Sequence, residues 1–532
     1  MIRVKAPQVS YENEIAELTK VFFPGEQVTV MMKKEHAGSS KAGCSDEELP
    51  LADTVLETGY TIDKPESIVF YAFLWQSNTI ICEYRTAKPL DADTEDSANG
   101  IRYGSYQLSR EDLKNPARKS NRLIKNGLKA CVFELLKKHT GQHPKWGAMT
   151  GIRPVKLVHE MLDKGMDDIN ARQELLTAYK LHPEKANLLI RTARNQRPFI
   201  DRQGTDRASV YINIPFCPTR CHYCSFPSDL IGRVESRMDA YLECLKQEIT
   251  AVMNQLSRTE TQVDTIYIGG GTPTVLEHSK LETLLRTVHE QIVSGYPIRE
   301  YTVEAGRPDS LDTEKLYLMK EYGVTRLSIN PQSMNQETLN RIGRGHTVEQ
   351  LVQVYKKARE IGYDSINMDV ILGLPGETAE HFQRTMSDIA VLDPDNITVH
   401  TLAVKRASAW KEEYAFNQYD SSRKGIAEEM ASVSREWMDR LGMEPYYLYR
   451  QKYMLDHLEN VGYSLPGKEC LYNIQFMHES RDVWAFGAGA SSKIYYPAED
   501  RLERIGNVKN LDDYLYRIDE MIGRKLRILK GS

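Results

Sequence analysis

Short β-branched segments alternate with longer amphipathic segments between residues 209 and 401. This alternation constrains the fold most, because strand–helix–strand units place their strands parallel in one sheet. Six strands are predicted, at Ser209–Ile214, Asp264–Ile268, Glu300–Glu304, Thr325–Ile329, Ser365–Ile371 and Asn396–Thr401. Helices are predicted between them, for example at Ser236–Leu256, Ser279–Val293, Val348–Ile361 and Ala379–Val391. The predicted fold class is α/β, a partial TIM-like barrel of six strand–helix units with its chemistry at the carboxyl ends of the strands.

The first predicted strand leads into a loop with three closely spaced cysteines, Cys217, Cys221 and Cys224. Three thiolates can ligate three irons of a [4Fe–4S] cluster and leave the fourth iron open for a small molecule, whereas such clusters usually use four cysteines. A zinc loop is the alternative, but zinc loops favour a second Cys pair or a Cys/His pair farther along the chain. No second pair follows, and His222 lies inside the loop. We therefore predict that the three cysteines ligate an iron–sulfur cluster.

The 532 residues are too many for one average domain, and four regions are predicted. They are a small N-terminal α+β domain (1–115), a helical connecting region (116–204), the partial barrel (205–402) and a C-terminal α+β domain that covers the substrate (403–532). In the first region a helix and three strands are predicted at Asn13–Phe22, Gln27–Met32, Ser67–Trp75 and Thr79–Arg85. In the last region a helix is predicted near Ser421–Leu441.

Composition excludes several classes of protein. The net charge of 69 − 74 = −5 argues against a general nucleic-acid binder. No apolar run approaches the ~20 residues that span a bilayer, and the first residues carry no apolar signal segment. The cysteines outside the loop show no disulfide-framework spacing, so we expect the reducing cytoplasm.

Polar and glycine residues follow the ends of the other predicted strands. The second strand is followed by Gly269–Thr272, whose triple glycine lets the backbone approach a ligand closely. The third strand ends in Glu304, Gln332 and Arg344 follow the fourth, and Asp369 lies on the fifth. Carboxylates suit ribose hydroxyls or an ammonium group, and arginine suits a carboxylate, so these residues together could bind a zwitterionic nucleoside. Taken singly, each is more often a structural hydrogen-bonding residue.

The cysteine loop, with Tyr223 before its third cysteine, and the triple glycine resemble the radical S-adenosylmethionine (SAM) superfamily. Within it, the chain resembles the oxygen-independent coproporphyrinogen III oxidase-like group, most closely its HemZ branch, over about residues 205 to 500. The match also includes Trp146–Lys156, Pro183–Ala186, Gly462–Cys470 and Phe486–Ser491. The resemblance implies a radical SAM barrel as the fold.

The resemblance also implies the cofactors and their ligands. Cys217, Cys221 and Cys224 would hold a [4Fe–4S] cluster, and SAM would chelate the open iron. The implied contacts to SAM are Tyr211, Tyr223, Gly270, Gly271, Thr272, Glu304, Gln332, Arg344, Asp369 and Ala403. The group places two SAM molecules in one cavity, and the resemblance does not assign each residue to one of the two. The implied partners are a tetrapyrrole substrate and an electron donor such as a flavodoxin or ferredoxin, with no nucleic acid and no membrane span.

The implied reaction belongs to porphyrin and haem biosynthesis. A SAM-derived radical would oxidatively decarboxylate two propionates of coproporphyrinogen III to vinyl groups, giving protoporphyrinogen IX. A substrate with four carboxylates needs cations, and Arg153, Lys156, Lys405 and Arg406 are candidates. A solvated charged face explains each of these cations at least as well.

Two departures from the group leave alternatives open. The authentic dehydrogenases carry a further cysteine two residues past the triplet, where this chain has Phe226. Haem chaperones of the group have a His-Asn pair in the C-terminal region, where this chain has Tyr472-Asn473 and so lacks the obvious axial haem ligand. The alternatives are an anaerobic haem ring-opening radical SAM enzyme, a haem carrier with a structural cluster, and a zinc-stabilised binding domain.

Overall fold

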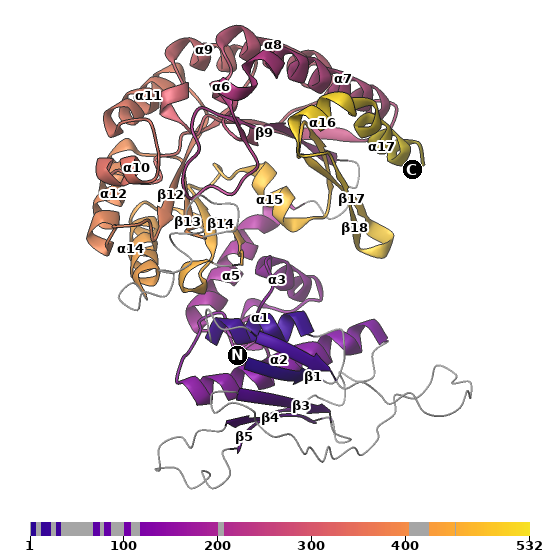
Figure 1. Cartoon of the computed structure of the whole chain (residues 1–532), viewed down its shortest axis with the longest axis vertical. Helices are drawn as coiled ribbons and strands as arrows, with labels where there is room; N and C mark the ends of the chain where they lie inside the picture. Colours follow the sequence, from indigo (N-terminus) through magenta and orange to yellow (C-terminus); the bar gives the residue numbers. More distant parts are fainter. Residues whose placement is uncertain are drawn as a thin grey trace. The chain divides into compact units, whose positions relative to one another are not determined.

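The computed structural model describes residues 2–6, 12–22, 28–32, 68–74, 79–86, 101–107, 117–200, 207–403, 425–452 and 454–531. The chain divides into two compact units, Met1–Ile152 with Val158–Ile190, and Arg153–Leu157 with Arg191–Ser532. The four predicted regions stay a prediction. Figure 1 shows both units, coloured along the sequence.

The first unit contains a five-stranded sheet in the order β2-β1-β3-β4-β5. Its strands are β1 (Ile2–Ala6), β2 (Val28–Met32), β3 (Ile68–Leu74), β4 (Thr79–Thr86) and β5 (Ile101–Gln107). Strand β1 is parallel to β2 and β3, whereas β3, β4 and β5 are antiparallel. Helices α1 (Glu12–Phe22) and α2 (Ala117–Thr140) pack on one another, and α4 (Asp168–Thr177) belongs to the same unit. Helices α3 (Pro154–Asp163) and α5 (Pro183–Gln196) have residues in both units. The predicted helix and three strands of this region are confirmed, and β1 and β5 were not predicted.

The second unit is built on an eleven-stranded sheet in the order β14-β15-β13-β12-β11-β10-β9-β6-β16-β17-β18. The six central strands are β6 (Arg207–Ile214), β9 (Gln262–Gly270), β10 (Glu300–Glu304), β11 (Arg326–Ser328), β12 (Ser365–Leu372) and β13 (Asn396–Thr401). All neighbouring pairs among these six are parallel. The predicted strands are confirmed, and the fold is the predicted α/β partial barrel.

Helices cover the outer side of this curved sheet. Figure 1 shows them there as an arc: α7 (Met238–Leu256), α8 (His278–Val288), α9 (Thr313–Glu321), α11 (Val348–Ile361) and α12 (Ala379–Leu392). The outward-facing residues of β9, such as Ile266 and Ile268, are fully buried beneath them. Because side chains alternate along a strand, Thr265 and Tyr267 face the inner side. There they contact α15 (Leu471–His478), which lies inside the curve in Figure 1.

Local signals explain why these helices begin and end where predicted. Thr347 and Thr378 each form a capping box at the start of α11 and α12, which satisfies backbone donors of the first turn. Helix α11 ends at Gly362, whose left-handed backbone (φ +86°) suits a residue without a side chain. The last five residues of the predicted Ser279–Val293 helix form a π-helical turn, His289–Val293.

The C-terminal part of the chain adds strands to both edges of the barrel sheet. Strands β14 (Glu444–Tyr449) and β15 (Asn460–Ser464) extend it beyond β13, and β16 (Asp482–Phe486) pairs parallel with β6. Strands β17 (Ser491–Tyr496) and β18 (Arg501–Gly506) complete that second edge. Further α-helices in the described residues are α6 (Ile231–Val234), α10 (Gln336–Arg341), α14 (Ile426–Arg440), α16 (Leu511–Tyr516) and α17 (Ile518–Gly531). Helix α14 confirms the helix predicted near Ser421–Leu441. In the described residues no helix is long and apolar enough to cross a membrane.

A buried ion pair joins α17 to α7. Lys525 Nζ lies 2.6 Å from Glu248 Oε1, and both side chains are completely buried. Glu248 also accepts hydrogen bonds from Asn507, Tyr514 and the Gly487 backbone, at 2.8 to 2.9 Å. The network therefore connects α7 to the end of β16, to α16 and to α17.

Replacing Lys525 by methionine should leave the Glu248 carboxylate buried without its cation. Loss of one partner of a buried pair costs about 3–5 kcal/mol, so the denaturant midpoint of the second unit should fall clearly. Tryptophan fluorescence during urea unfolding measures this midpoint, with Lys530→Met on the exposed side of α17 as the matched control. Equal midpoints for the two variants would show that the pair contributes nothing.

Candidate cofactor site

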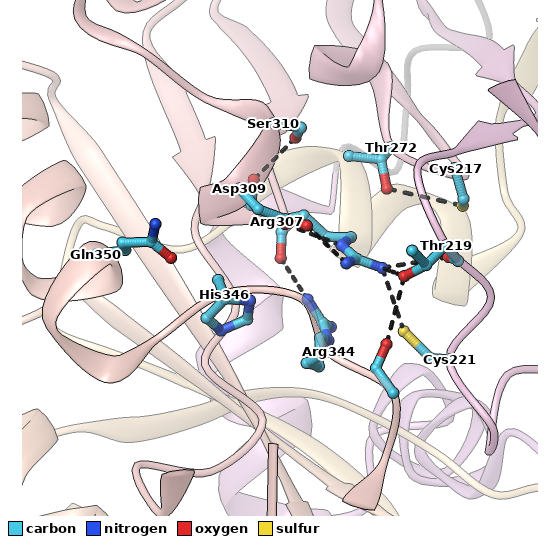
Figure 2. A network of polar contacts seen from close by, with 12 residues as sticks. Cys217, Thr219, Cys221, Thr272, Arg307, Asp309, Ser310, Arg344, His346 and Gln350 are labelled. Atoms are coloured by element: carbon cyan, nitrogen blue, oxygen red, sulfur yellow. Dashed lines mark hydrogen bonds and ion pairs between the residues drawn. The ribbon is translucent and has the colours of Figure 1, made fainter. Parts of the chain in front are cut away.

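The three loop cysteines lie close together at the carboxyl end of β6. Thr272 Oγ1 donates to Cys217 Sγ at 3.7 Å, and Arg307 Nη1 donates to Cys221 Sγ at 3.8 Å (Figure 2). The backbone N–H of Cys224 donates to the Cys221 carbonyl at 3.0 Å. Burial raises the pKa of the Cys224 thiol, and the neighbouring Cys221 and Cys217 sulfurs raise it further.

These contacts fit an iron–sulfur cluster. Donors aimed at cysteine sulfurs stabilise thiolates and tune the reduction potential of such clusters. In the part of the chain that the structure describes, no three His, Cys, Asp or Glu side chains converge on one metal ion. A [4Fe–4S] cluster does not need that arrangement, because each cysteine ligates a different iron.

Arg307 connects the segment after β10 to the cysteine loop. Its Nε and Nη2 donate to the two carboxylate oxygens of Asp309, at 3.0 and 2.7 Å. Its Nη1 donates to the Thr219 hydroxyl and carbonyl, at 2.7 and 3.2 Å, and this side chain is only 4% exposed. Burial alone would raise the pKa of Asp309, but Arg307 holds it below its usual value. These contacts fix the guanidinium beside Cys221 (Figure 2).

Arg344 lies in the same network. Its Nη2 donates to the Tyr223 hydroxyl at 3.1 Å, and its Nη1 donates to the Gly306 carbonyl at 2.9 Å. Its Nε is buried and has no hydrogen-bond partner among the described residues. Both ring nitrogens of the neighbouring His346 are also buried without a hydrogen-bond partner among the described residues (Figure 2). Burial, and to a smaller extent the charge of Arg344, lowers the pKa of His346 to about 4. Arg344 is thus a fixed cation with one donor left over for a ligand.

Glu304 is held at the end of β10 by two donors. The Tyr267 hydroxyl donates to its Oε1 at 2.6 Å, and the Gly270 N–H donates to its Oε2 at 3.1 Å. Burial raises the pKa of Glu304, although both donors oppose that shift.

At each position of the triple glycine, neighbouring protein atoms occupy the space that a side chain would need. A Cβ on Gly269 would meet the Glu304 carboxylate, one on Gly270 would meet the Asn213 side chain, and one on Gly271 would meet the Phe216 carbonyl. Gly270 also has a φ of +109°, which disfavours other residues. The sequence suggested a ligand-facing wall, and the packing gives a second reason for the three glycines. Contacts of Gly270, Gly271 and Thr272 to SAM stay a prediction.

Gln332 and Asp369 meet across β11 and β12. The Gln332 N–H donates to the Asp369 carbonyl at 2.8 Å, and Gln332 is a buried non-glycine residue at φ +65°. Such strained backbone persists where the surroundings fix it, often at binding sites. The Asp369 carboxylate accepts from Asn367 at 2.7 Å and lies 3.6 Å from His400 Nε2. Burial would raise the pKa of Asp369, but these neighbours hold it below its usual value, so the group is ionised at neutral pH. Ala403 follows β13 and bridges Met454.

Stacked rings form an aromatic floor on the inner side of the sheet. Its members are Tyr211, Tyr267, Tyr472 and Phe476. Tyr472 stacks on Tyr267 with ring centroids 4.6 Å apart, and on Phe476 at 5.8 Å. Tyr211 lies 6.2 Å from both Tyr267 and Tyr472, and its hydroxyl donates to Asn213.

The structure thus brings together most of the predicted site residues. Cys217, Thr272, Cys221, Tyr223 and Arg344 belong to one network, and Tyr211 joins Glu304 through Tyr267. Sequence reasoning missed Arg307, Asp309, His346 and Tyr267. Arg307 comes three residues after Glu304, so its place after a strand end was an available signal. Lys405 and Arg406 lie outside the described residues.

A partial barrel with a three-cysteine loop after its first strand defines a radical SAM protein. Residues 211–389 match the model of the radical SAM superfamily. The oxygen-independent coproporphyrinogen-III oxidase-like protein HemZ of Bacillus subtilis is 40% identical over 413 residues, which is 76% of this chain and 81% of HemZ. The chain therefore belongs to the radical SAM superfamily and, within it, to the HemZ family of coproporphyrinogen III oxidase-like proteins. Its cofactors are a [4Fe–4S] cluster and SAM.

Two further proteins are similar. The heme chaperone HemW of Bacillus subtilis is 30% identical over 308 residues, which is 58% of this chain and 76% of HemW. The solved structure of coproporphyrinogen III oxidase HemN from Escherichia coli is 23% identical, with a TM-score of 0.47 over 62% of this chain and 73% of HemN.

Removing the Arg307 charge should lower the midpoint potential of the cluster. The guanidinium beside Cys221 favours the reduced, more negative cluster, and a loss of about 1.4 kcal/mol corresponds to ~60 mV for one electron. We expect Arg307→Gln to shift the potential down by that order, as measured by anaerobic redox titration with EPR detection. Arg341→Gln is the matched control, because Arg341 contacts Glu337 and the Pro375 carbonyl instead. An unchanged potential at full iron content would contradict the assigned role.

Arg344→Gln and Asp369→Asn should retain the cluster but weaken SAM binding. A lost hydrogen bond to a charged group costs about 1.5–3 kcal/mol, or roughly ten- to a hundredfold in affinity. Equilibrium dialysis of SAM against the reconstituted proteins tests this. The controls are Arg384→Gln and Asp388→Asn on the outer helix α12, which should bind SAM like the unchanged protein. Wild-type affinity in both site variants would make these residues structural.

Proposed function

We propose that the chain is an oxygen-independent coproporphyrinogen III dehydrogenase, a radical SAM oxidoreductase of porphyrin and haem biosynthesis. It converts two propionate side chains of coproporphyrinogen III to vinyl groups and so forms protoporphyrinogen IX. The similarity to HemZ over most of both chains supports this substrate class.

The packing of Tyr472 is the observation that favours an enzyme over a haem carrier. Tyr472 occupies the position of the histidine expected in a chaperone, and it lies buried within the aromatic floor. Burial raises the pKa of its phenol well above the usual value, and Tyr211 and Glu304 add to the shift. A tyrosinate ligand to haem iron would require both deprotonation and removal from the stack. Tyr472 therefore suits an apolar surface and not an axial ligand.

The chemistry balances with one electron from a donor and one electron to an acceptor for each propionate. Held by Cys217, Cys221 and Cys224, a reduced cluster with SAM would supply radical chemistry that removes a hydrogen atom from the β-carbon of a propionate. The substrate then loses CO2 and one electron to an acceptor, which leaves a vinyl group. Each of the two propionates requires one such cycle. A low-potential donor such as a flavodoxin or ferredoxin is the matching electron source.

The chain's own residues bind and orient the reactants in this proposal. Asp369, held ionised by its neighbours, accepts hydrogen bonds from ribose hydroxyls, and Arg344 offers its free Nε donor to a carboxylate. Glu304, fixed by Tyr267 and Gly270, accepts from the SAM ammonium group. Arg307 keeps a positive charge beside the cluster.

A haem carrier is the second candidate, because the heme chaperone HemW is 30% identical over 76% of its length. A carrier would bind haem tightly without consuming SAM. Met477 and His478 are the nearest alternative ligands to Tyr472. His478 Nδ1 is 2.6 Å from the Ser480 hydroxyl.

The decisive measurement is hydrogen transfer from the substrate. Coproporphyrinogen III carrying deuterium on the propionate β-carbons is incubated anaerobically with the reconstituted protein, SAM and dithionite. We expect deuterium in 5′-deoxyadenosine, formed in step with CO2, and a tetrapyrrole product that has lost two CO2. Cys217→Ala is the control, and it should give neither product because the cluster loses one of its three ligands.

Each other outcome identifies a different function. Haem that co-purifies at one per chain, with no deuterium transfer, would replace the dehydrogenase by the carrier. An opened or methylated tetrapyrrole formed when haem is supplied would replace it by ring-opening chemistry.

A further inference from the structure

Three cations surround one carboxylate at the edge of the aromatic floor. Glu479 follows α15, pairs with Arg153, and has its Oε1 3.2 Å from Lys493 Nζ and 3.7 Å from Arg504 Nη2. We name these four residues the Glu479 cluster. With every group ionised, the cluster would carry three positive charges and one negative charge.

The cluster is mostly buried. The side chains of Lys493, Glu479 and Arg153 are 6, 13 and 17% exposed, and only Arg504, at 60%, is open to solvent. Burial, together with Arg153 and Arg504, lowers the pKa of Lys493 to about 6 even though Glu479 lies 3.2 Å away. Burial and Arg504 likewise lower the pKa of Arg153 to about 10. With a pKa of about 6, Lys493 is largely uncharged at neutral pH. Arg153 and Arg504 still exceed Glu479 by one positive charge, and a bound anion would favour the protonated lysine.

Sheet register places the cluster beside the floor. Lys493 on β17 pairs with Arg504 on β18 and with Val483 on β16. Val483 belongs to the same hydrophobic cluster as Tyr472 and Phe476. The Lys493 ammonium lies over the Phe476 ring, 3.2 Å from its centroid, and donates to the Phe476 carbonyl. An apolar, stacked surface thus ends directly at a group of cations.

This juxtaposition matches one class of ligand: a broad apolar ring with carboxylates at its rim. We propose that the Glu479 cluster is the subsite for a propionate carboxylate of the tetrapyrrole, with the ring lying toward the aromatic floor. The inference rests on the proposed function, since it assigns a binding site within it. An acidic electron-donor protein is less suited to this site, because three of the four side chains are at most 17% exposed.

The test uses coproporphyrin III, the fluorescent oxidised form of the substrate, titrated into the reconstituted protein. Arg504→Gln and Lys493→Met should each weaken its binding about ten- to a hundredfold, the effect of losing a hydrogen bond to a charged group. Arg501→Gln is the matched control, because Arg501 lies on the same strand but pairs with Glu499 and Glu503. The tetraamide of coproporphyrin III, which has the ring without its charges, should bind all four proteins equally weakly.

The outcomes separate this inference from the proposed function. Arg504 is 60% exposed, so its replacement leaves the core packing unchanged. Wild-type affinity for coproporphyrin III in Arg504→Gln would overturn the subsite. If the unchanged protein still forms protoporphyrinogen IX in that case, the proposed function is retained and only the subsite is rejected. Failure of the unchanged protein to bind or convert any tetrapyrrole would overturn both. Slower reduction by flavodoxin in Arg504→Gln, at unchanged coproporphyrin affinity, would make the cluster a docking surface and also overturn the subsite.

Discussion

The parallel register of the central strands decides which side chains meet at the site. Tyr211 on β6 lies opposite Tyr267 on β9, and Glu304 on β10 lies opposite Ser328 on β11. Because successive side chains alternate between the two faces, a slip of one residue would turn these groups toward the outer helices. The apolar residues between them, such as Ile266 and Val303, are fully buried, and this burial holds the register. The polar groups at the strand ends thus owe their positions to the apolar residues beside them.

The inner face of such a sheet carries polar groups that need partners, and α15 supplies them. The carboxylate of Glu300 accepts from the backbone N–H groups of Leu471 and Tyr472 at the first turn of α15, at 2.8 and 3.0 Å. A carboxylate is favourable at that end of a helix. Gln475 contacts Ser209, Thr265 and Asp264 from the same helix. Helix α15 therefore lies against the inner face of the sheet and contributes Tyr472 and Phe476 to the aromatic floor.

The sequence was sufficient to predict those elements and site residues whose signal is local. Each predicted strand and helix of the barrel has its own hydrophobic period. Glu304 stands out because it ends β10, Gln332 because it follows β11, and Asp369 because it is a carboxylate within the apolar strand β12. It was insufficient where the partner is distant: Arg307 contacts Cys221 across 86 positions, and only the folded chain shows that pairing. The same holds for Glu479, whose three cations come from α3's start and from two strands. Strand β5 was missed because Gly104 interrupts its pattern.

The position of Tyr472 connects fold to chemistry. A histidine there could turn a ring nitrogen toward a metal, whereas Tyr472 is fixed by stacking on Tyr267 and Phe476. Its phenol stays protonated because burial opposes the charged form. The aromatic floor consequently consists of neutral, stacked rings, while the charged groups lie at its margins: Arg307 and Arg344 near the cysteines, and the Glu479 cluster beside Phe476. The substrate of the proposed reaction is a tetrapyrrole without a metal, which needs no axial ligand, so stacked rings with cations at their margin suit it better than a metal-ligating side chain would.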